Sequence, residues 1–501
     1  MTRRFLATAL AAATLGGCAA VGPDFTAPGA PATSAYLSPA DIAQARASAA
    51  IAGPTQDGPS VALGETVTAQ WWTLFRSPAI DAVVRQAIGA SPTLDSARAR
   101  LAQARDLVAQ ARGEKYPQIG LNVSDAEQKQ SSAAFGLPPQ VFPLPSRYNL
   151  FQVGPTASYR LDLFGGVRRE IELRGAQADV QADRLDAAYM TLTGNAVTQA
   201  LRVAALRAQI AAIDDILAID RKNAALVARE REIGEAPDPD VVVARGQVAA
   251  DEGLRPALDQ QLAVARHALA VLVGRSPGDW SPPDFDLTAL TLPGRIPVSL
   301  PSELVHRRPD ILAVEAQLHA DSAQIGVATA QLYPQITLTA GASASSLNGA
   351  DLFSTSGLVW SVAAGLTEPV FDGGMRRAQR RAALDAFRAS AADYRQTVLT
   401  AFGQVADLLQ ALDHDRDQLA GQQRSLDLAT RSVDLQRIAY ARGAIGVLPL
   451  LDAQRQYHQA RLGVLRAQAQ RYQDTAALMV AMGGGWWGAS LETPAPQAKG
   501  R

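Results

Sequence analysis

The chain offers few side chains for covalent, acid–base or metal chemistry. Its one cysteine, Cys18, excludes an intrachain disulfide. Its histidines show no spacing to one another, to the cysteine or to acidic residues that is typical of a metal site. The histidines are His267, His306, His319, His414 and His458. The sequence therefore predicts no metal site and no cofactor.

Motifs for catalysis are missing from the sequence as well. It contains no Walker A loop, no dinucleotide-binding glycine fingerprint and no nucleophile elbow. His414 lies in the charged run 413–417, which we interpret as a solvated helix face. Arg307-Arg308-Pro309-Asp310 resembles an active-site motif, but proline suits the first position of a helix and Asp310 there favours the helix dipole. We predict no catalytic residue and no enzymatic activity.

Cys18 stands at the end of a secretion signal. Two arginines precede the short apolar run Phe5–Leu15, which is shorter than the about 20 apolar residues that cross a bilayer. Leu15-Gly16-Gly17-Cys18 resembles the lipobox of bacterial lipoproteins, which implies cleavage before Cys18 and a covalent N-terminal lipid on it. Ala19 follows, which resembles the pattern for sorting to the outer membrane. A plain signal peptide with an incidental cysteine is the alternative.

Length and composition allow several domains and a large core. The chain has 501 residues, of which 48% are hydrophobic, and its net charge of −1 points to no nucleic acid partner. No segment after the signal has 18 apolar residues without a charge, so no transmembrane helix is predicted. A membrane-crossing region would have to be a closed β-barrel.

The second half of the chain repeats the first. Ser91-Pro92-Thr93-Leu94 corresponds to Arg308-Pro309-Asp310-Ile311, and Tyr116-Pro117 to Tyr333-Pro334, both at an offset of 217 residues. Each repeat reads as helix, β-hairpin, long helix, turn and helix. The resulting segments are a signal peptide (1–17), a lipid-anchored N-terminal segment and belt (18–90), repeat 1 (91–275), a Pro-rich linker (276–301), repeat 2 (302–482) and a C-terminal tail (483–501).

Apolar and polar residues alternate strictly after each Tyr-Pro pair. The alternation covers Ile119–Val123 and Val153–Leu163 in the first repeat, and Ile336–Ser345 and Leu358–Leu366 in the second. Most of these lengths suit membrane-spanning strands, which have about 9–11 residues. One row of side chains would then face lipid and the other water. Two hairpins of an ordinary soluble sheet are the alternative.

Four strands cannot close a barrel, and open strand edges are not tolerated in lipid. The chain must therefore oligomerise if these strands span a membrane. Two copies would give eight strands, a barrel filled by side chains, whereas three would give twelve, with room for a pore. The loops Asp125–Leu150 and Ser346–Gly357 would face the outside of the cell.

Two long stretches without proline follow the hairpins. Val167–Ile233 and Gly374–Arg442 have about 67 residues each, or roughly 100 Å as helices. Apolar residues recur every seven positions, for example from Leu384 to Tyr440, which predicts coiled-coil packing. Many of them are alanines, so neighbouring helices can approach closely.

Short motifs recur in a fixed order along nearly the whole chain. They are Gly17-Cys18, Val21-Gly22-Pro23-Asp24-Phe25, Trp71-Trp72 with Phe75, Ser91-Pro92-Thr93-Leu94, Arg307-Arg308-Pro309-Asp310-Ile311, Tyr333-Pro334, Pro369-Val370-Phe371-Asp372-Gly373-Gly374 and Leu450-Leu451-Asp452-Ala453-Gln454. Each motif is weak alone, but together with the repeat they are specific. In these respects the chain resembles the outer-membrane factors of resistance-nodulation-division (RND) efflux systems, the TolC-like or NodT-like lipoproteins.

The resemblance implies an α+β membrane protein that works as a homotrimer. Three chains would form a twelve-stranded outer-membrane β-barrel, continued by a long periplasmic α-helical coiled-coil barrel. A periplasmic adaptor (membrane fusion protein) and an inner-membrane RND transporter would be its partners. The protein would be a passive duct for small molecules. A type I protein-secretion duct and a non-channel periplasmic coiled-coil scaffold are the alternatives.

The resemblance also implies a gate at the periplasmic helix tips. The turns at Gly234 and Gly443 would lie there and contact the adaptor. Asp452 matches a family carboxylate that rings the aperture, where three copies would favour cations and disfavour their own ionisation. Tyr440 and Asp240 match a pair that ties the tips together in the closed state.

Overall fold

The computed structural model describes residues 20–29, 33, 35–41, 43, 60–129, 147–354 and 357–484. The lipidation site Cys18 and most of the loop predicted between the first two strands lie outside these ranges. The chain forms two compact units. Unit 1 consists of Met1–Pro28, Arg100–Gln181 and Val314–Tyr394, and unit 2 of Gly29–Ala99, Ala182–Ala313 and Arg395–Arg501.

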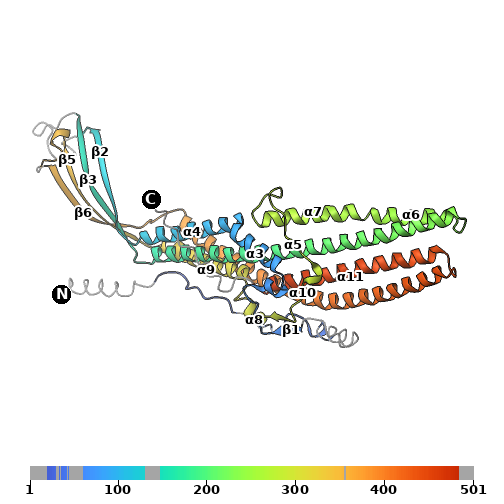
Figure 1. The fold of residues 1–501 in the computed structure, drawn as a ribbon. Coiled ribbons are helices and arrows are strands. Elements are labelled where there is room, and N and C mark those ends of the chain that lie inside the picture. The colour runs from blue at the N-terminus through green and yellow to red at the C-terminus, as the bar shows by residue number, and fades with distance from the viewer. Residues whose placement is uncertain are drawn as a thin grey trace, which may run out of the picture. The chain divides into compact units, whose positions relative to one another are not determined.

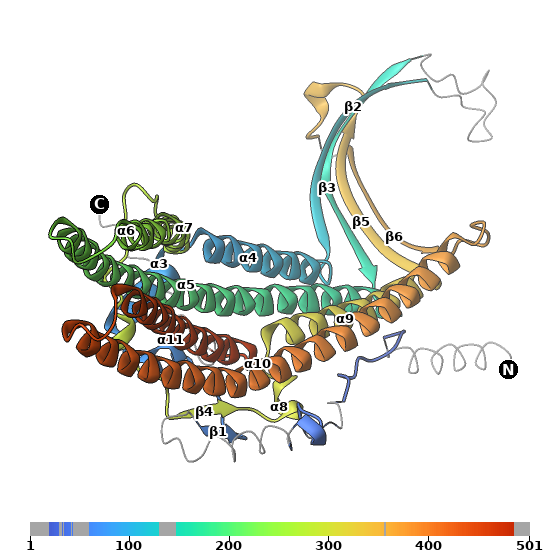
Figure 2. The same ribbon diagram turned by 90° about the vertical axis from the view of Figure 1, so that its right-hand side faces the viewer.

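Unit 1 contains one antiparallel sheet with four strands. In spatial order they are β2 (Gln118–Gln128), β3 (Tyr148–Leu161), β5 (Gln335–Ser346) and β6 (Leu358–Thr367) (Figure 1). β3 pairs with β5, so the hairpins of the two repeats join into a single sheet. The sheet is strongly curved (Figure 2). In the described part of the chain, β2 and β6 each pair on one side only.

The register of the sheet places one mainly apolar row of residues from each of the four strands on the same face. Leu121 lies opposite Pro155, Ala157 opposite Ala340, and Ala340 opposite Val362. Because residues directly opposite each other point to the same side of a sheet, the apolar rows merge into a continuous surface. We call this surface the apolar face: Ile119, Leu121, Val123, Val153, Pro155, Ala157, Tyr159, Leu161, Ile336, Leu338, Ala340, Ala342, Ala344, Leu358, Trp360, Val362, Ala364 and Leu366.

The strands differ from the prediction at their ends. Asp125 and Leu150 were assigned to a loop but lie in β2 and β3, where Asp125 is opposite Phe151. Backbone hydrogen bonds extend a ladder regardless of side-chain polarity, so pairing continues where the alternation stops. β3 ends before Leu163, because the Asp162 carboxylate accepts hydrogen bonds from the first backbone N–H groups of the following helix.

Two helices of 67 residues confirm the predicted long helices. They are α5 (Gly166–Glu232) and α10 (Met375–Ala441), and each contributes to both units. α4 (Pro92–Gly113) and α9 (Pro309–Ala330) precede the two hairpins, as the repeat predicted. Within the described ranges, no helix combines the length and the apolar composition required to cross a membrane.

The Val21–Phe25 motif docks onto the helices of unit 1. The Arg169 guanidinium of α5 donates to the Val21 carbonyl at 3.1 Å and to the Asp24 carboxylate at 2.7 Å. The Phe25 ring stacks on His319 of α9, with ring centroids 4.5 Å apart. The motif therefore fixes the segment that follows the predicted lipid site.

In unit 2 each long helix is followed by a returning helix. α11 (Val447–Ala481) returns as one helix after α10. After α5, the predicted single helix is broken into α6 (Asp238–Glu252) and α7 (Arg255–Leu272). Pro256 lies in the first turn of α7, and proline has no N–H to continue the hydrogen-bond ladder of a preceding helix, so the break follows.

A core of aromatic residues stabilises the rest of unit 2. Trp71, Trp72 and Phe75 of the 3-10 helix η1 (Trp71–Phe75) are fully buried, and Trp72 Nε1 donates to Asp81 at 2.9 Å. Tyr472 of α11 packs on Phe75. The other elements of unit 2 are α3 (Pro78–Ala90), η3 (Leu287–Ala289), α8 (Pro301–Leu304) and two short parallel strands, β1 (Ser60–Leu63) and β4 (Arg295–Val298). In unit 1, the 3-10 helix η4 (Gly349–Asp351) lies between β5 and β6.

The Arg-Pro-Asp motif has the structural role that was predicted. α9 begins at Pro309, and Asp310 lies in its first turn. Arg308 is buried and donates to Asp310, to the Ala481 carbonyl at 3.1 Å and to Gln404 at 3.0 Å. The motif therefore joins α9 to α10 and α11.

The prediction of a solvated helix face at 413–417 is correct for His414 but wrong for Asp415. His414 is exposed, whereas Asp415 is only 6% exposed. Burial raises the pKa of Asp415 to about 7, and the nearby Asp474 carboxylate on α11 adds to the rise. The run looked solvated because the sequence does not show which side of α10 meets α11.

Replacing Asp415 with asparagine should stabilise the protein at pH 8 but not at pH 4. The pKa of an aspartate in the unfolded chain is about 3.9. A carboxyl group whose pKa is higher in the folded protein stabilises the fold below that value and loses this contribution as the pH rises through the folded pKa. Asparagine cannot ionise, so at pH 8 the free energy of unfolding of the variant should exceed that of the parent by on the order of 1 kcal/mol or more. Thermal melting of the purified protein at both pH values measures this.

Asp427→Asn is the matched control, because Asp427 is exposed on the same helix. It should shift the melting temperature equally at both pH values. A pH-independent effect of Asp415→Asn would contradict the burial of an ionisable group at this position.

Candidate functional site

The predicted tips are built by the same turn in both repeats. Gly234 and Gly443 follow α5 and α10 with φ angles of 82° and 70°, a backbone conformation that residues other than glycine rarely adopt. The Gly443 N–H donates to the Tyr440 carbonyl at 2.9 Å, and the next N–H donates to the Ala439 carbonyl at 2.9 Å. Gly234 and Glu235 repeat both bonds, so each long helix ends in the same glycine-capped motif.

A small apolar core joins the helices next to these turns. Val227 of α5, Val241 and Ala244 of α6, and Val447 and Leu451 of α11 are all buried in it. Tyr440 of α10 packs against the same cluster. The tip core therefore holds helices from both repeats together.

The structure ties the two long helices together through Tyr440 and Glu230. The Tyr440 hydroxyl donates to Glu230 Oε1 at 2.5 Å. Burial raises the pKa of Tyr440, and this bond and the charges of Glu230 and Asp240 raise it further. The bond therefore joins the neutral phenol to a carboxylate, a combination that strengthens hydrogen bonds.

Asp240, the partner that the resemblance implied for Tyr440, lies in the first turn of α6. It contributes charge near Tyr440, while the hydrogen bond goes to Glu230. Glu230 was not predicted, although the repeat carries a signal for it. Glu230 and Tyr440 each occupy the last turn before a capping glycine, so the repeat places them at equivalent helix ends.

Asp452 is exposed near the start of α11. Its carboxylate accepts hydrogen bonds from Arg455 and, at 2.9 Å, from Gln456. Both partners follow it on the same helix, so they leave the carboxylate at the surface of unit 2.

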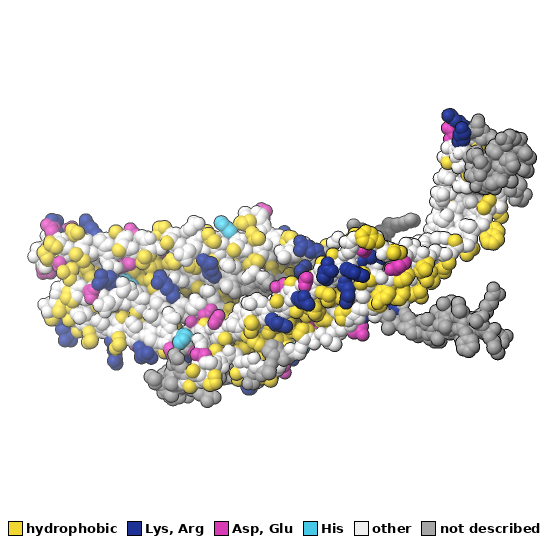
Figure 3. All heavy atoms as spheres, turned by 180° about the vertical axis from the view of Figure 1, so that it is seen from behind, with side chains coloured by type: hydrophobic (Ala, Val, Ile, Leu, Met, Phe, Trp, Pro, Cys, Tyr) yellow, Lys and Arg dark blue, Asp and Glu magenta, His cyan; other side chains and the backbone are white. Residues whose placement is uncertain are grey.

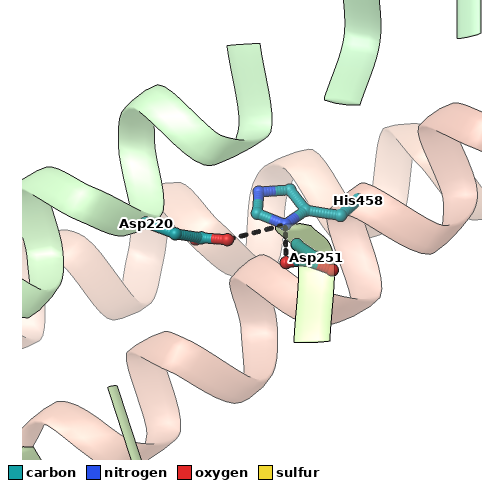
Figure 4. Close-up of side chains that lie close together, drawn as sticks. All are labelled: Asp220, Asp251 and His458. Carbon is teal, nitrogen blue, oxygen red and sulfur yellow. Dashed lines mark ion pairs between the residues drawn. The ribbon is translucent and has the colours of Figure 1, made fainter. Parts of the chain in front are cut away.

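A buried cluster of potential ligands corrects the prediction that the histidines form no ligand cluster with acidic residues. His458 of α11 meets Asp220 of α5 and Asp251 of α6 (Figure 4). His458 Nδ1 lies 3.9 Å from an oxygen of each carboxyl group. The three side chains are almost fully buried, and one ligand atom of each lies within 4.8 Å of the others. Sequence spacing could not reveal the cluster, because three separate helices supply it.

The cluster is polar but poorly satisfied. Neither ring nitrogen of His458 has a hydrogen-bond partner among the described residues, and the oxygens of Asp220 have one only when a proton is shared with Asp251. Burial raises the pKa of Asp220, and the neighbouring Asp251 adds to the rise. Burial also lowers the pKa of His458, although Asp251 opposes this. A neutral imidazole beside carboxyl oxygens is a typical ligand set for a divalent metal ion.

Comparison with known proteins identifies the family. The profile of the outer membrane efflux protein family matches residues 83–275 and 300–484. The pyoverdine export outer membrane protein OpmQ of Pseudomonas aeruginosa is 31% identical over 83% of this chain and 87% of its own. The cation efflux system protein CusC of Escherichia coli is 27% identical over 86% of this chain and 92% of its own.

A solved structure agrees with this result. The outer-membrane channel OprN superposes with a TM-score of 0.81 at 27% identity, over 93% of this chain and 99% of OprN. The match extends over both units, including the sheet and the long helices. The chain belongs to the outer membrane efflux protein family and functions as an outer-membrane efflux channel.

Proposed function

We propose that three copies of the chain form one channel, which passively conducts small molecules from an inner-membrane transporter and a periplasmic adaptor to the outside of the cell. The observation that carries the proposal is the sheet of unit 1, whose apolar face is exposed and whose two edges are open in the single chain. The exposed apolar face is unfavourable in water and the open edges are unfavourable in lipid, so the sheet requires an environment that the single chain lacks.

The apolar face is suited to lipid. Leu121, Trp360 and Val362 are 73%, 73% and 74% exposed. Removing apolar surface from water is worth about 25 cal/mol per Å², and large exposed apolar patches mark membrane or protein contacts. On the side seen in Figure 3, the middle of the sheet carries hydrophobic and other uncharged side chains, and the charged ones gather near its end.

The edges of the sheet support assembly into a closed ring. The unpaired backbone groups of β2 and β6 cannot be left open in lipid. Pairing β6 of one copy with β2 of the next satisfies them, and three copies of a curved sheet give twelve strands around a pore. Such a ring would place the small and polar residues of the opposite face toward water.

The long helices offer a second surface for the neighbouring copies. On α10, the apolar residues Leu399, Leu428, Leu435 and Ile438 are at least half exposed in the single chain. Leu428 and Leu435 are seven residues apart, the spacing of a coiled-coil contact. These side chains would be covered by helices of an adjacent copy in an α-helical barrel.

The relatives favour small molecules as the cargo. OpmQ is named for the export of pyoverdine and CusC for the efflux of cations. Because such different cargoes are handled by similar chains, we propose that the adaptor and the transporter select the cargo. A protein-secretion duct has no such support, and a periplasmic scaffold would not need the apolar face.

The tips supply the proposed gate. The Tyr440–Glu230 hydrogen bond would hold the ends of α5 and α10 together in the closed channel. The exposed Asp452 carboxylates of three copies would form a ring at the aperture and attract cations. The neighbouring turns at Gly234 and Gly443 would contact the adaptor.

Arginine at Ala364 should impair assembly more than arginine at Ala363. Ala364 belongs to the apolar face and Ala363 to the opposite one, on the same strand and at nearly the same depth. A lipid-facing arginine near mid-membrane costs roughly 2–4 kcal/mol, whereas one facing the pore can be hydrated. The yield of heat-sensitive trimers on unheated SDS gels measures assembly. Equal yields from the two variants would refute the assigned faces.

Cys18→Ser in a chain with a non-lipoprotein signal should remain in the outer membrane. Acyl chains contribute about 0.8 kcal/mol per buried CH₂, but the sheet should hold the protein without them. Membrane fractionation shows where the protein is, and the intact mass of the parent protein shows whether Cys18 carries the lipid. A variant that is freely soluble in the periplasm would overturn the proposal that the sheet spans the membrane.

Tyr440→Phe should raise the open probability of single channels in planar bilayers. It removes a hydrogen bond to a charged group, a contribution of about 1.5–3 kcal/mol, and leaves the ring in the tip core. Asp452→Ala should lower the selectivity for cations over anions. Recordings under a salt gradient report both properties.

Tyr394→Phe is the control for the tyrosine, because the Tyr394 hydroxyl has no hydrogen-bond partner among the described residues. It should leave opening unchanged. If Tyr440→Phe opens no more often than the parent, and Asp452→Ala is equally selective, the gate lies elsewhere.

A further inference from the structure

The cluster of Asp220, Asp251 and His458 has no role in the channel proposed above. It lies inside the packing of α5, α6 and α11 in unit 2, and its side chains are almost fully buried. Figure 4 shows the imidazole of His458 with Nδ1 directed toward both carboxyl groups. The ring is 4% exposed, and neither of its nitrogens has a hydrogen-bond partner in the described part of the chain.

Such an arrangement is unfavourable without a further partner. A buried donor or acceptor that lacks a hydrogen bond costs about 1–3 kcal/mol, and apolar residues of similar size would avoid this cost. The tip core of Val227, Val241 and Leu451 is apolar, and the buried Gln454 one turn from the cluster is satisfied by Asn223, which donates to it at 2.7 Å. His458 Nδ1 and one carboxyl oxygen each of Asp220 and Asp251 lie within 4.8 Å of one another, so one bound partner could contact all three residues.

We infer that Asp220, Asp251 and His458 form a binding site for a first-row divalent transition-metal ion such as Zn²⁺. Each residue offers one ligand atom, a carboxylate oxygen or the Nδ1 of His458. The inference does not depend on the proposed channel function, because it concerns the packing inside unit 2.

The geometry suits a small ion after a slight contraction. Ligand atoms bound to Zn²⁺ at about 2.0–2.2 Å in a tetrahedron lie about 3.4 Å from one another. His458 Nδ1 is 3.9 Å from an oxygen of either carboxyl group, so these two pairs have to approach by about 0.5 Å. All three ligand atoms already lie within 4.8 Å of one another. A water molecule would complete the four ligands.

The chemistry of the ligands selects the class of ion. An imidazole ligand favours Zn²⁺ and its neighbours in the first transition row, whereas Ca²⁺ and Mg²⁺ prefer sites made of oxygen alone. Gln247 donates a hydrogen bond of 2.7 Å to Asp251, an outer contact of the kind that orients a metal-binding carboxylate. The nearby Arg461 is engaged at 2.7 Å by Asp215, so its charge is offset.

A bound ion would join helices from both repeats. Asp220 and Asp251 come from the first repeat, on α5 and α6, and His458 comes from α11 in the second. An ion that binds only the folded arrangement stabilises it. Metal binding should therefore raise the melting temperature and hold α11 against the α5–α6 pair.

Titration of metal-free protein with Co²⁺ and Zn²⁺ tests the inference. The full-length protein in detergent is freed of metal with a chelator, and Co²⁺ then serves as the spectroscopic probe for the Zn²⁺ site. We expect one Co²⁺ per chain with visible absorption bands, displacement of Co²⁺ by Zn²⁺, and a melting temperature that rises with Zn²⁺. His458→Gln should lose the absorption bands and the thermal shift.

Two further variants keep the test decisive. His414→Gln is the matched control, because His414 is exposed on α10 and outside the cluster, and it should bind like the parent. Gln247→Ala leaves all three ligands in place and should weaken binding about 10–100-fold. This variant decides the question if His458→Gln does not fold.

The competing explanation is a proton shared by the two carboxyl groups, with no metal. In that case the parent protein binds no stoichiometric Co²⁺ or Zn²⁺, and its stability depends on pH but not on metal. That result would overturn the inference. Binding that survives unchanged in both His458→Gln and Gln247→Ala would overturn it too, because the ion would then lie elsewhere.

Discussion

The hydrogen-bonding requirement of the backbone in lipid is the constraint on which the proposed assembly depends. The sheet of unit 1 has an apolar face that is unfavourable in water, but its open edges are unfavourable in a membrane. In the proposed trimer, closure with further copies would satisfy both the side chains and the backbone. In that trimer the long helices would pack in the same symmetry, which would account for their seven-residue repeat and their many small contact residues.

The two repeats end their long helices in the same way. Each long helix of 67 residues ends in a glycine-capped turn, and each is followed by a returning helix. The Tyr440–Glu230 bond and the tip core then join helices of both repeats next to these turns. An apolar core stabilises the helices but can be rearranged, while a directional bond favours one arrangement, so the combination would suit the gate proposed above.

Buried polar groups mark the places where the helix core departs from simple hydrophobic packing. Asp415 faces Asp474, and His458 lies between Asp220 and Asp251, at positions that apolar residues could occupy at lower cost. Arg308, by contrast, is buried with its hydrogen bonds satisfied. The satisfied group serves as a structural joint, whereas the unsatisfied cluster requires a ligand or a proton.

The sequence alone determined the local elements of this protein, because alternation, heptads, prolines and glycines act over a few residues. It predicted both long helices, all four strands and the start of α9 at Pro309. Tertiary structure decided which residues meet across elements. It joined the two hairpins into one sheet through β3 and β5, paired Tyr440 with Glu230, buried Asp415 and gathered Asp220, Asp251 and His458. These contacts depend on which side of each helix faces its neighbour, and in helices whose contact rows are rich in alanine the sequence pattern leaves that side open.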